Sequence, residues 1–150
     1  LNVHARYTRR EILAAFANTS DIKLPEWREG VRWLPEAKVE LLAFTLDKTS
    51  GHFSPTTRYR DYAISPKLLH WESQSGTREA SDAGQRYQTH ESNDIAILSM
   101  ARLTTNDRAF WLLGPVKYVS HEGERPMAIT WSLANPLPGD LFASFAAAVA

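Results

Sequence analysis

The sequence contains no cysteine. This absence excludes a disulfide framework, a thiolate nucleophile and a zinc site with cysteine ligands. Long hydrophobic runs are missing as well: none approaches the ~20 residues of a membrane span, and the first residues lack the basic, apolar and small-residue order of a signal peptide. We therefore expect a cytoplasmic protein without a membrane partner.

Glycine is scarce, and its 7 residues stand singly. The sequence therefore lacks a dinucleotide-binding fingerprint, a phosphate-binding loop and a Gly-x-Ser-x-Gly nucleophile elbow. His121-Glu122 begins like a zinc-protease motif, but Gly123 and Pro126 would interrupt the helix, and no second histidine follows at the required spacing. We expect no catalytic residue, no metal site and no cofactor, hence a module that is not an enzyme. A hydrolase with an unrecognised Ser or His is the weakest alternative.

Charge of either sign is not in excess, since 17 Lys and Arg balance 17 Asp and Glu among 150 residues, and 43% of the residues are hydrophobic. These values predict one folded domain over residues 1–150. The chain starts at Leu1 and ends in an Ala-rich apolar tail. We interpret it as a recognition module excised from a larger protein.

Local patterns predict a strand-rich domain with a helix near each end. Thr8 and Glu11 form a capping box that starts a helix. The apolar run from Val39 predicts a strand covered on both faces. The polar stretch Ser75 to Gln85 predicts an exposed loop, and Asp140 is expected to cap a terminal helix. Further strands are expected at Tyr59–Ile64, Leu68–Ser73, Ile95–Leu103, Ala109–Ser120 and Met127–Leu133. The predicted fold class is α+β, a curled sheet or partly open β-barrel flanked by helices.

The segment from Phe53 to Tyr62 gathers aromatic rings, arginines and hydroxyl groups within ten positions. Aromatic rings stack on bases, a carboxylate accepts hydrogen bonds from base amino groups, and arginine binds phosphate. The segment therefore favours nucleic-acid recognition. The alternative, equally compatible with the spacing, is that Tyr59 and Tyr62 are core or half-core strand residues. Arg58 and Arg60 would then pair with Asp61 or Glu72.

A second candidate segment, from His70 to Gln74, places Trp71 at the end of a strand before the polar loop. There the ring could form a pocket wall, although a core position is the commoner one for tryptophan. Zero net charge is unfavourable for DNA binding, but Arg6, Arg9 and Arg10 form an acid-poor cluster and indicate a polarised surface.

Seven sequence blocks, in one order along nearly the whole chain, resemble the C-terminal domain of unknown function found behind superfamily-two helicase cores. The blocks are His4–Glu11, Arg28–Val31 with Trp33–Glu36, Thr45–Lys48, Phe53–Ser65, His70–Trp71 with Ser73–Gln74, Gly84–Tyr87 with His90, and Leu113–Pro115 with Tyr118–Met127. The chain departs from the commoner family pattern in the loop at 76–84 and at Leu69 and Glu72, where Phe and Gln are more usual.

The resemblance implies a context and a fold. In such bacterial proteins the domain follows a phospholipase-D-type nuclease and a helicase, and some resemble type IV restriction enzymes of bacterial defence. The fold is expected to be similar to SRA or PUA-like domains, which take a flipped modified base into a pocket. The expected partners are therefore double-stranded DNA carrying a modified base and the helicase and nuclease domains of the same chain.

We hypothesise a reader of modified DNA, with 5-methylcytosine the favoured modification, that acts by base flipping. Roles are assigned by chemistry alone. The base-pocket candidates are Tyr59, Asp61, Tyr62, Trp71 and Ser73. The candidates for the DNA backbone or groove are Ser54, Thr56, Thr57, Arg58, Arg60, Gln74, Arg86, Tyr87 and His90. The alternatives are a DNA-binding module that ignores modification and a module that docks on the helicase or nuclease.

Overall fold

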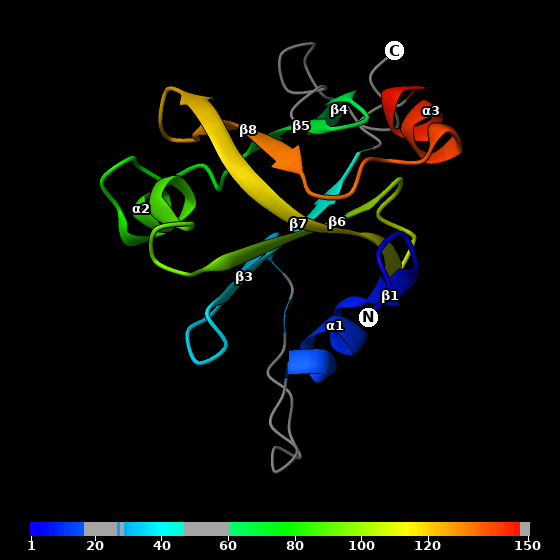
Figure 1. Cartoon of the computed structure of the whole chain (residues 1–150), viewed down its shortest axis with the longest axis horizontal. Helices are drawn as coiled ribbons and strands as arrows, with labels where there is room; N and C mark the ends of the chain where they lie inside the picture. Colours follow the sequence, from blue (N-terminus) through cyan, green and yellow to red (C-terminus); the bar gives the residue numbers. More distant parts are fainter. Residues whose placement is uncertain (17–26, 28, 47–60, 148–150) are drawn as a thin grey trace.

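The computed structural model describes residues 1–16, 27, 29–46 and 61–147. These residues form eight strands and three helices (Figure 1). The strands are β1 (Arg6–Thr8), β2 (Val31–Leu34), β3 (Val39–Thr45), β4 (Tyr62–Ser65), β5 (Leu68–Glu72), β6 (Ala96–Arg102), β7 (Ala109–Glu122) and β8 (Ala128–Leu133); the helices are α1 (Arg9–Phe16), α2 (Asp82–Thr89) and α3 (Gly139–Ala147).

The strands form one 8-stranded sheet in the order β2-β3-β6-β7-β8-β5-β4, with β1 paired to β7 beside this path. Only the pairing of β3 with β6 is parallel among the described strands. The path ends at β2 and β4, so the sheet is open, and Figure 1 shows it strongly curled around the long β7. The predicted fold class, α+β with an open curled sheet and flanking helices, is confirmed.

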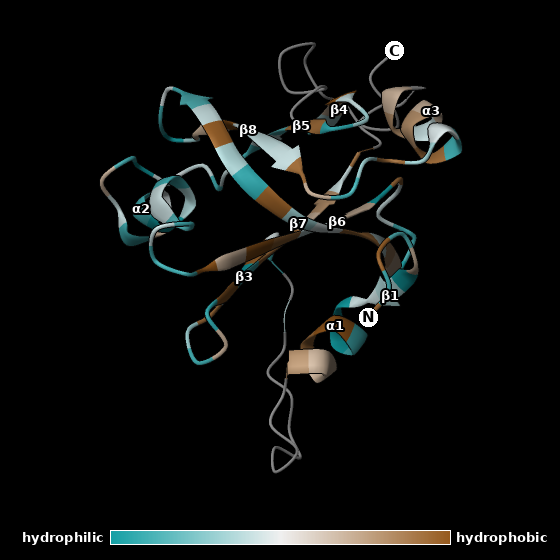
Figure 2. Cartoon of the chain, viewed as in Figure 1, coloured by the Kyte–Doolittle hydropathy of each residue, from teal (hydrophilic) through white to brown (hydrophobic). Residues whose placement is uncertain are grey.

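Alternation of side chains fixes which face of the sheet is buried. Along β8 the buried residues Ile129, Trp131 and Leu133 alternate with half-exposed ones. Figure 2 shows the same alternation as brown and teal bands along β7. By contrast, β3 is buried from Val39 to Phe44, as its sequence predicts, because hydrophobic clusters lie on both of its faces. One cluster contains Trp71 and Trp131, and the other lies beneath α1.

The helix ends test the predictions from local sequence. The capping box is confirmed: Thr8 N–H donates to Glu11 Oε1 over 2.9 Å, and Glu11 N–H donates to Thr8 Oγ1 over 3.2 Å. The loop predicted over Ser75–Gln85 is partly wrong, because α2 begins at Asp82. Asp140 lies inside α3 rather than at its cap, since the helix starts at Gly139. None of the helices in the described ranges is long and apolar enough to cross a membrane.

Candidate nucleic-acid interface

Asp61 lies immediately before β4 and is held by the neighbouring strand. Its Oδ1 accepts a hydrogen bond from the backbone N–H of Glu72 over 3.0 Å. The two residues meet because β4 and β5 pair antiparallel, which brings the start of β4 beside the end of β5. This bond fixes one oxygen of a half-buried carboxylate. A carboxylate oriented in this way can accept a hydrogen bond from the amino group of a base.

Next to Asp61, the rings of Tyr62 and His70 stack. Their centroids are 4.8 Å apart and their planes are inclined by 15°. The strand register continues this row across the sheet, with His70 opposite Thr130 and Thr130 opposite Ser120. Residues that face each other in register lie on one side of a sheet. The row therefore presents aromatic rings and hydroxyl groups together on the face opposite Trp71 and Trp131.

Ser73 joins the end of β5 to the start of β8. Its N–H donates to the Met127 carbonyl over 3.0 Å, and its Oγ accepts from the Met127 N–H over 2.8 Å. The same hydroxyl donates to the Gln74 carbonyl over 3.0 Å. Ser73 is buried, and its hydroxyl donates one hydrogen bond and accepts another inside the protein. Ser73 is thus a structural clamp next to the exposed Gln74, and this correction removes it from the base-pocket residues.

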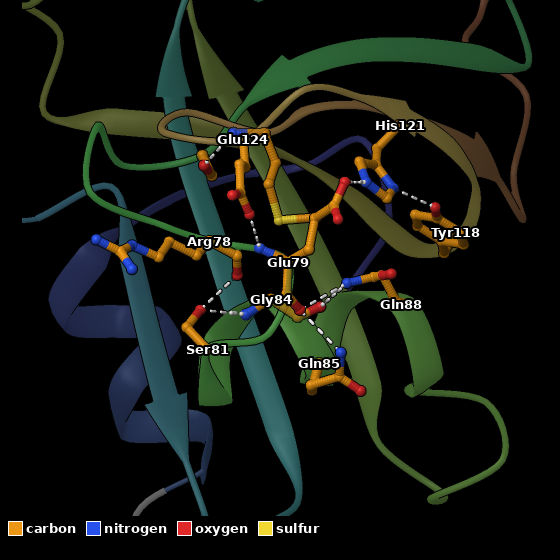
Figure 3. A network of polar contacts seen from close by, with 11 residues as sticks. Arg78, Glu79, Ser81, Gly84, Gln85, Gln88, Tyr118, His121 and Glu124 are labelled. Atoms are coloured by element: carbon orange, nitrogen blue, oxygen red, sulfur yellow. Dashed lines mark hydrogen bonds and ion pairs between the residues drawn. The ribbon is translucent and has the colours of Figure 1, made fainter.

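The loop after Gln74 is attached to the β7–β8 hairpin (Figure 3). Glu79 N–H donates to Glu124 Oε2 over 2.9 Å, and Arg125 N–H donates to the Thr77 carbonyl over 2.8 Å. Ser81 then caps α2, because its Oγ accepts from Gly84 N–H over 3.1 Å. Such attachment holds the exposed part of the loop in a fixed position, which suits a binding loop.

Arg78 is a functional candidate that sequence reasoning missed. Its carbonyl accepts hydrogen bonds from the N–H and the Oγ of Ser81, so its backbone is fixed. Its exposed side chain extends away from the network in Figure 3. An exposed guanidinium on a fixed loop can reach phosphate. The signal in the sequence was a lone arginine in a polar loop, which by itself carries little information.

A chain of three side chains links the same loop to β7. Tyr118 Oη lies 2.6 Å from His121 Nδ1, and His121 Nε2 lies 2.7 Å from Glu79 Oε1. Burial, and then the charge of Glu79, raise the pKa of Tyr118. The phenol therefore stays protonated and can donate to His121 Nδ1, while Nε2 donates to the carboxylate. These hydrogen-bonded side chains also hold the loop against the hairpin.

A surface hollow of about 290 Å³ lies beside Tyr118, and its other lining residues are Gln88, Thr89, His90, Glu91 and Ser92. It therefore lies at the end of α2, which Figure 1 places well apart from β4.

In the described part of the chain, no three His, Asp or Glu side chains gather so that they could hold a metal ion.

Three aromatic or imidazole side chains assigned to base or DNA contacts lie in the interior, which corrects those assignments. Trp71 is 3% exposed and Tyr87 is 1% exposed. The two rings pack edge to face, with their centroids 5.5 Å apart. The core position is therefore the right one for Trp71. His90 is 3% exposed; its Nε2 accepts from Tyr118 N–H over 3.1 Å, and its Nδ1 lies 3.0 Å from the Ile95 carbonyl oxygen. The rings of Trp71 and Tyr87 are therefore enclosed by the core, and His90 is committed to two internal hydrogen-bonding contacts where it lines the hollow beside Tyr118.

Arg86 is half-buried and engaged inside the protein. Its Nη2 lies 3.5 Å from Glu40 Oε1, and its guanidinium carbon lies 4.6 Å from the centroid of the Trp33 ring. This pairing compensates the charge of Glu40, whose side chain is 1% exposed. The assignment of Arg86 to phosphate is therefore corrected to an internal ion pair.

The structure brings Asp61 and Tyr62 together with a residue not assigned a role from sequence, His70. The alternation in Leu68–Glu72 is a partial signal, because it places His70 on the face opposite Leu69 and Trp71 but leaves open which of the two faces is buried. The remaining candidates, Ser54, Thr56, Thr57, Arg58, Tyr59 and Arg60, lie outside the described residues.

Comparisons with known proteins identify a family and a fold. The chain matches no curated protein. It is similar in structure to a chain in the crystal structure of KRYPTONITE in complex with mCHH DNA, H3(1-15) peptide and SAH, with a TM-score of 0.51 and 10% sequence identity. The match covers 93% of this chain and 32% of that chain, so this chain spans about a third of the matched protein's length. This similarity confirms the predicted SRA-like fold.

The family model described as a domain of unknown function, DUF3427, matches residues 1–145. The match includes every described strand, the site around Asp61, and α3 up to Phe145. The chain therefore belongs to the DUF3427 family of domains of unknown function.

Proposed function

We propose that this chain is a DNA-reader domain that recognises a modified base, with 5-methylcytosine favoured, after the base has left the duplex. The observation that carries the proposal is the fixed carboxylate of Asp61 beside the stacked Tyr62 and His70 rings. The SRA-like fold supports it, because the matched protein was crystallised with mCHH DNA. The rest of the proposal follows from the chemistry of these groups.

The Asp61 carboxylate supplies the acceptor for a cytosine amino group. Since Glu72 N–H holds Oδ1 in place, the orientation of the carboxylate is set before a base arrives. Hydrogen bonds to charged groups are worth roughly 1.5–3 kcal/mol. That gain and ring stacking offset the few kcal/mol that extrusion of a base costs. Tyr62 and His70 replace Trp71 as the stacking groups, because Trp71 is buried.

Selectivity for the methyl group follows from burial of one carbon. A buried methyl contributes about 0.8 kcal/mol, which corresponds to about a fourfold preference over unmodified cytosine. We propose that the domain is a recognition module without catalytic residues. It directs the helicase and nuclease domains of its parent protein, a type IV restriction-like enzyme, to modified DNA.

The test is competition binding with duplexes carrying cytosine, 5-methylcytosine or 5-hydroxymethylcytosine at one position. The wild type should prefer the methylated duplex about fourfold. Asp61→Asn and Tyr62→Ala should each weaken binding to that duplex about tenfold, through the lost charged hydrogen bond and the lost stacking. Asp94→Asn is the matched control, because Asp94 is exposed in the turn between α2 and β6.

Two results would contradict the proposal. Equal affinity for all three duplexes would indicate DNA binding that ignores modification. Absence of DNA binding at low salt would indicate a docking module instead. In the parent protein, cleavage of methylated DNA that survives Asp61→Asn would remove the role in directing the nuclease.

A further inference from the structure

Two arginines from distant parts of the sequence share one aromatic ring. The guanidinium carbons of Arg9 and Arg102 lie 5.1 and 4.6 Å from the centroid of the Phe110 ring. Phe110 is 1% exposed. Arg9 also lies over the ring of Trp27, at 5.5 Å. The fold therefore concentrates two positive charges at one place on the rim of the hydrophobic cluster beneath α1.

Strand pairing creates this arrangement. Tyr7 of β1 is opposite Phe110 of β7, so α1, which starts at Arg9, begins next to that ring. Arg102 ends β6, the neighbour of β7 on the other side, and the opposition of Ala101 to Trp111 leaves Arg102 on the Phe110 face. Figure 1 shows α1 and β1 far from β4 and β5. The arginine pair is therefore separate from the site around Asp61.

Within the described residues, the hydrogen bonds of the two guanidinium groups go to neutral oxygens. Arg102 Nε donates to Thr45 Oγ1 over 2.9 Å, and its Nη1 donates to the Asp107 carbonyl over 2.7 Å. Arg9 Nη2 donates to the Glu29 carbonyl over 3.4 Å. Arg9 Nε is buried without a hydrogen-bond partner in the part of the chain that the structure describes. A buried N–H without an acceptor costs free energy, and an acceptor on a bound ligand would remove that cost.

Electrostatics support the same point. Burial lowers the pKa of Arg9, the charge of Arg102 lowers it further, and the charge of Glu29 opposes this. Burial also lowers the pKa of Arg102, against the charge of Asp107. Both shifts disfavour the two positive charges in this place. An anion bound between them would relieve the repulsion.

We propose that Arg9 and Arg102 form a binding site for a phosphate group. The planar guanidinium presents a fork of N–H donors that matches the oxygens of a phosphate. Two guanidinium groups over the same ring can therefore both donate to one phosphate. The phosphate belongs either to the backbone of a bound duplex or to a free phosphate compound. The first source rests on the proposed DNA-reader function, and the second does not.

The first experiment measures duplex affinity against salt for the whole chain. Loss of one phosphate contact lowers the slope of log affinity against log salt by about one. The double variant Arg9→Met, Arg102→Met should therefore weaken binding more at 50 mM than at 200 mM salt. The ratio of wild-type to variant affinity should fall about fourfold as salt rises over that range. Lys38→Met is the matched control, since Lys38 is an exposed cation in the turn between β2 and β3, at the opposite end of β3 from Thr45, the partner of Arg102. Arg102→Lys keeps the charge, and it should weaken binding while retaining the slope.

The second experiment titrates inorganic phosphate at constant ionic strength and follows Tm and amide chemical shifts. Phosphate should raise the Tm of the wild type and of Lys38→Met and should leave the folded double variant unchanged. This result with an unchanged salt slope would assign the site to free phosphate. An unchanged slope together with no phosphate effect on the wild type overturns the proposal. A wild type that binds no DNA but responds to phosphate would refute the reader function alone.

Discussion

Replacing Gly84 by alanine tests whether the contact between α2 and the loop before it is as close as the structure has it. A Cβ atom at Gly84 would lie 2.0 Å from the Arg78 carbonyl oxygen and 3.0 Å from the Glu79 carbonyl oxygen. Both are backbone atoms, so no side-chain rotation can relieve the overlap. The helix must move away from the loop by more than an ångström.

That movement has a cost that can be worked from the contacts. It breaks the bond from Gly84 N–H to Ser81 Oγ, and those from the Gln85 and Gln88 amides to the Glu79 carbonyl. Losing these three bonds costs about 1 kcal/mol each. The better helix propensity of alanine returns about 1 kcal/mol. We expect a net loss of about 2 kcal/mol in the free energy of unfolding, which lowers Tm by about 4–8 °C in a domain of this size.

Urea unfolding followed by circular dichroism measures this loss. Gly76→Ala is the control, because Gly76 lies in the same loop and a Cβ there meets nothing within 4 Å. It should leave stability unchanged or raise it by about 0.4–1 kcal/mol, since alanine restricts the unfolded chain. If the two variants are equally stable, the close approach of α2 to Arg78 is refuted.

Three further predictions concern stability. Trp71→Ala should cost about 3–5 kcal/mol in urea unfolding, because it empties a core position; full stability would refute the buried placement. Thr8→Ala removes the side chain that accepts from Glu11 N–H, and it should cost about 1 kcal/mol, a loss that thermal unfolding would detect. Burial raises the pKa of Glu40, against the opposing charge of Arg86, so the folded state holds this proton more tightly than the unfolded chain does. The stability of the wild type relative to Glu40→Gln should therefore be greatest below the unfolded value of 4.5 and fall as pH rises through the folded pKa; urea unfolding at several pH values would contradict this if the difference stayed constant.

The elements found from sequence share one property: their signals are local. The capping box needs only two side chains three residues apart, and Thr8 and Glu11 satisfy each other without help from the rest of the fold. The buried β3 is visible because its residues are apolar on both faces. Helix α2 was missed because its sequence is mostly polar. Its start depends on Ser81 and on a loop attached to the β7–β8 hairpin.

The candidate site was found in part. Asp61 and Tyr62 were identified from a chemically dense segment, and they lie together beside His70. The period of two along a strand separates His70 from Trp71, but it does not say which of the two faces the core. Packing decided that, because Trp71 fits against Tyr87 and Trp131 in the interior.

The sequence by itself determined the class of the fold and the position of most strands, because hydrophobic alternation, capping and turn residues act over a few positions. Only the tertiary structure decided which distant groups meet. The Glu72 N–H orients Asp61, β3 pairs parallel with β6, and Arg9 and Arg102 both lie over the ring of Phe110. These meetings depend on strand order, and strand order depends on how the whole chain best buries its apolar surface, which no local pattern encodes.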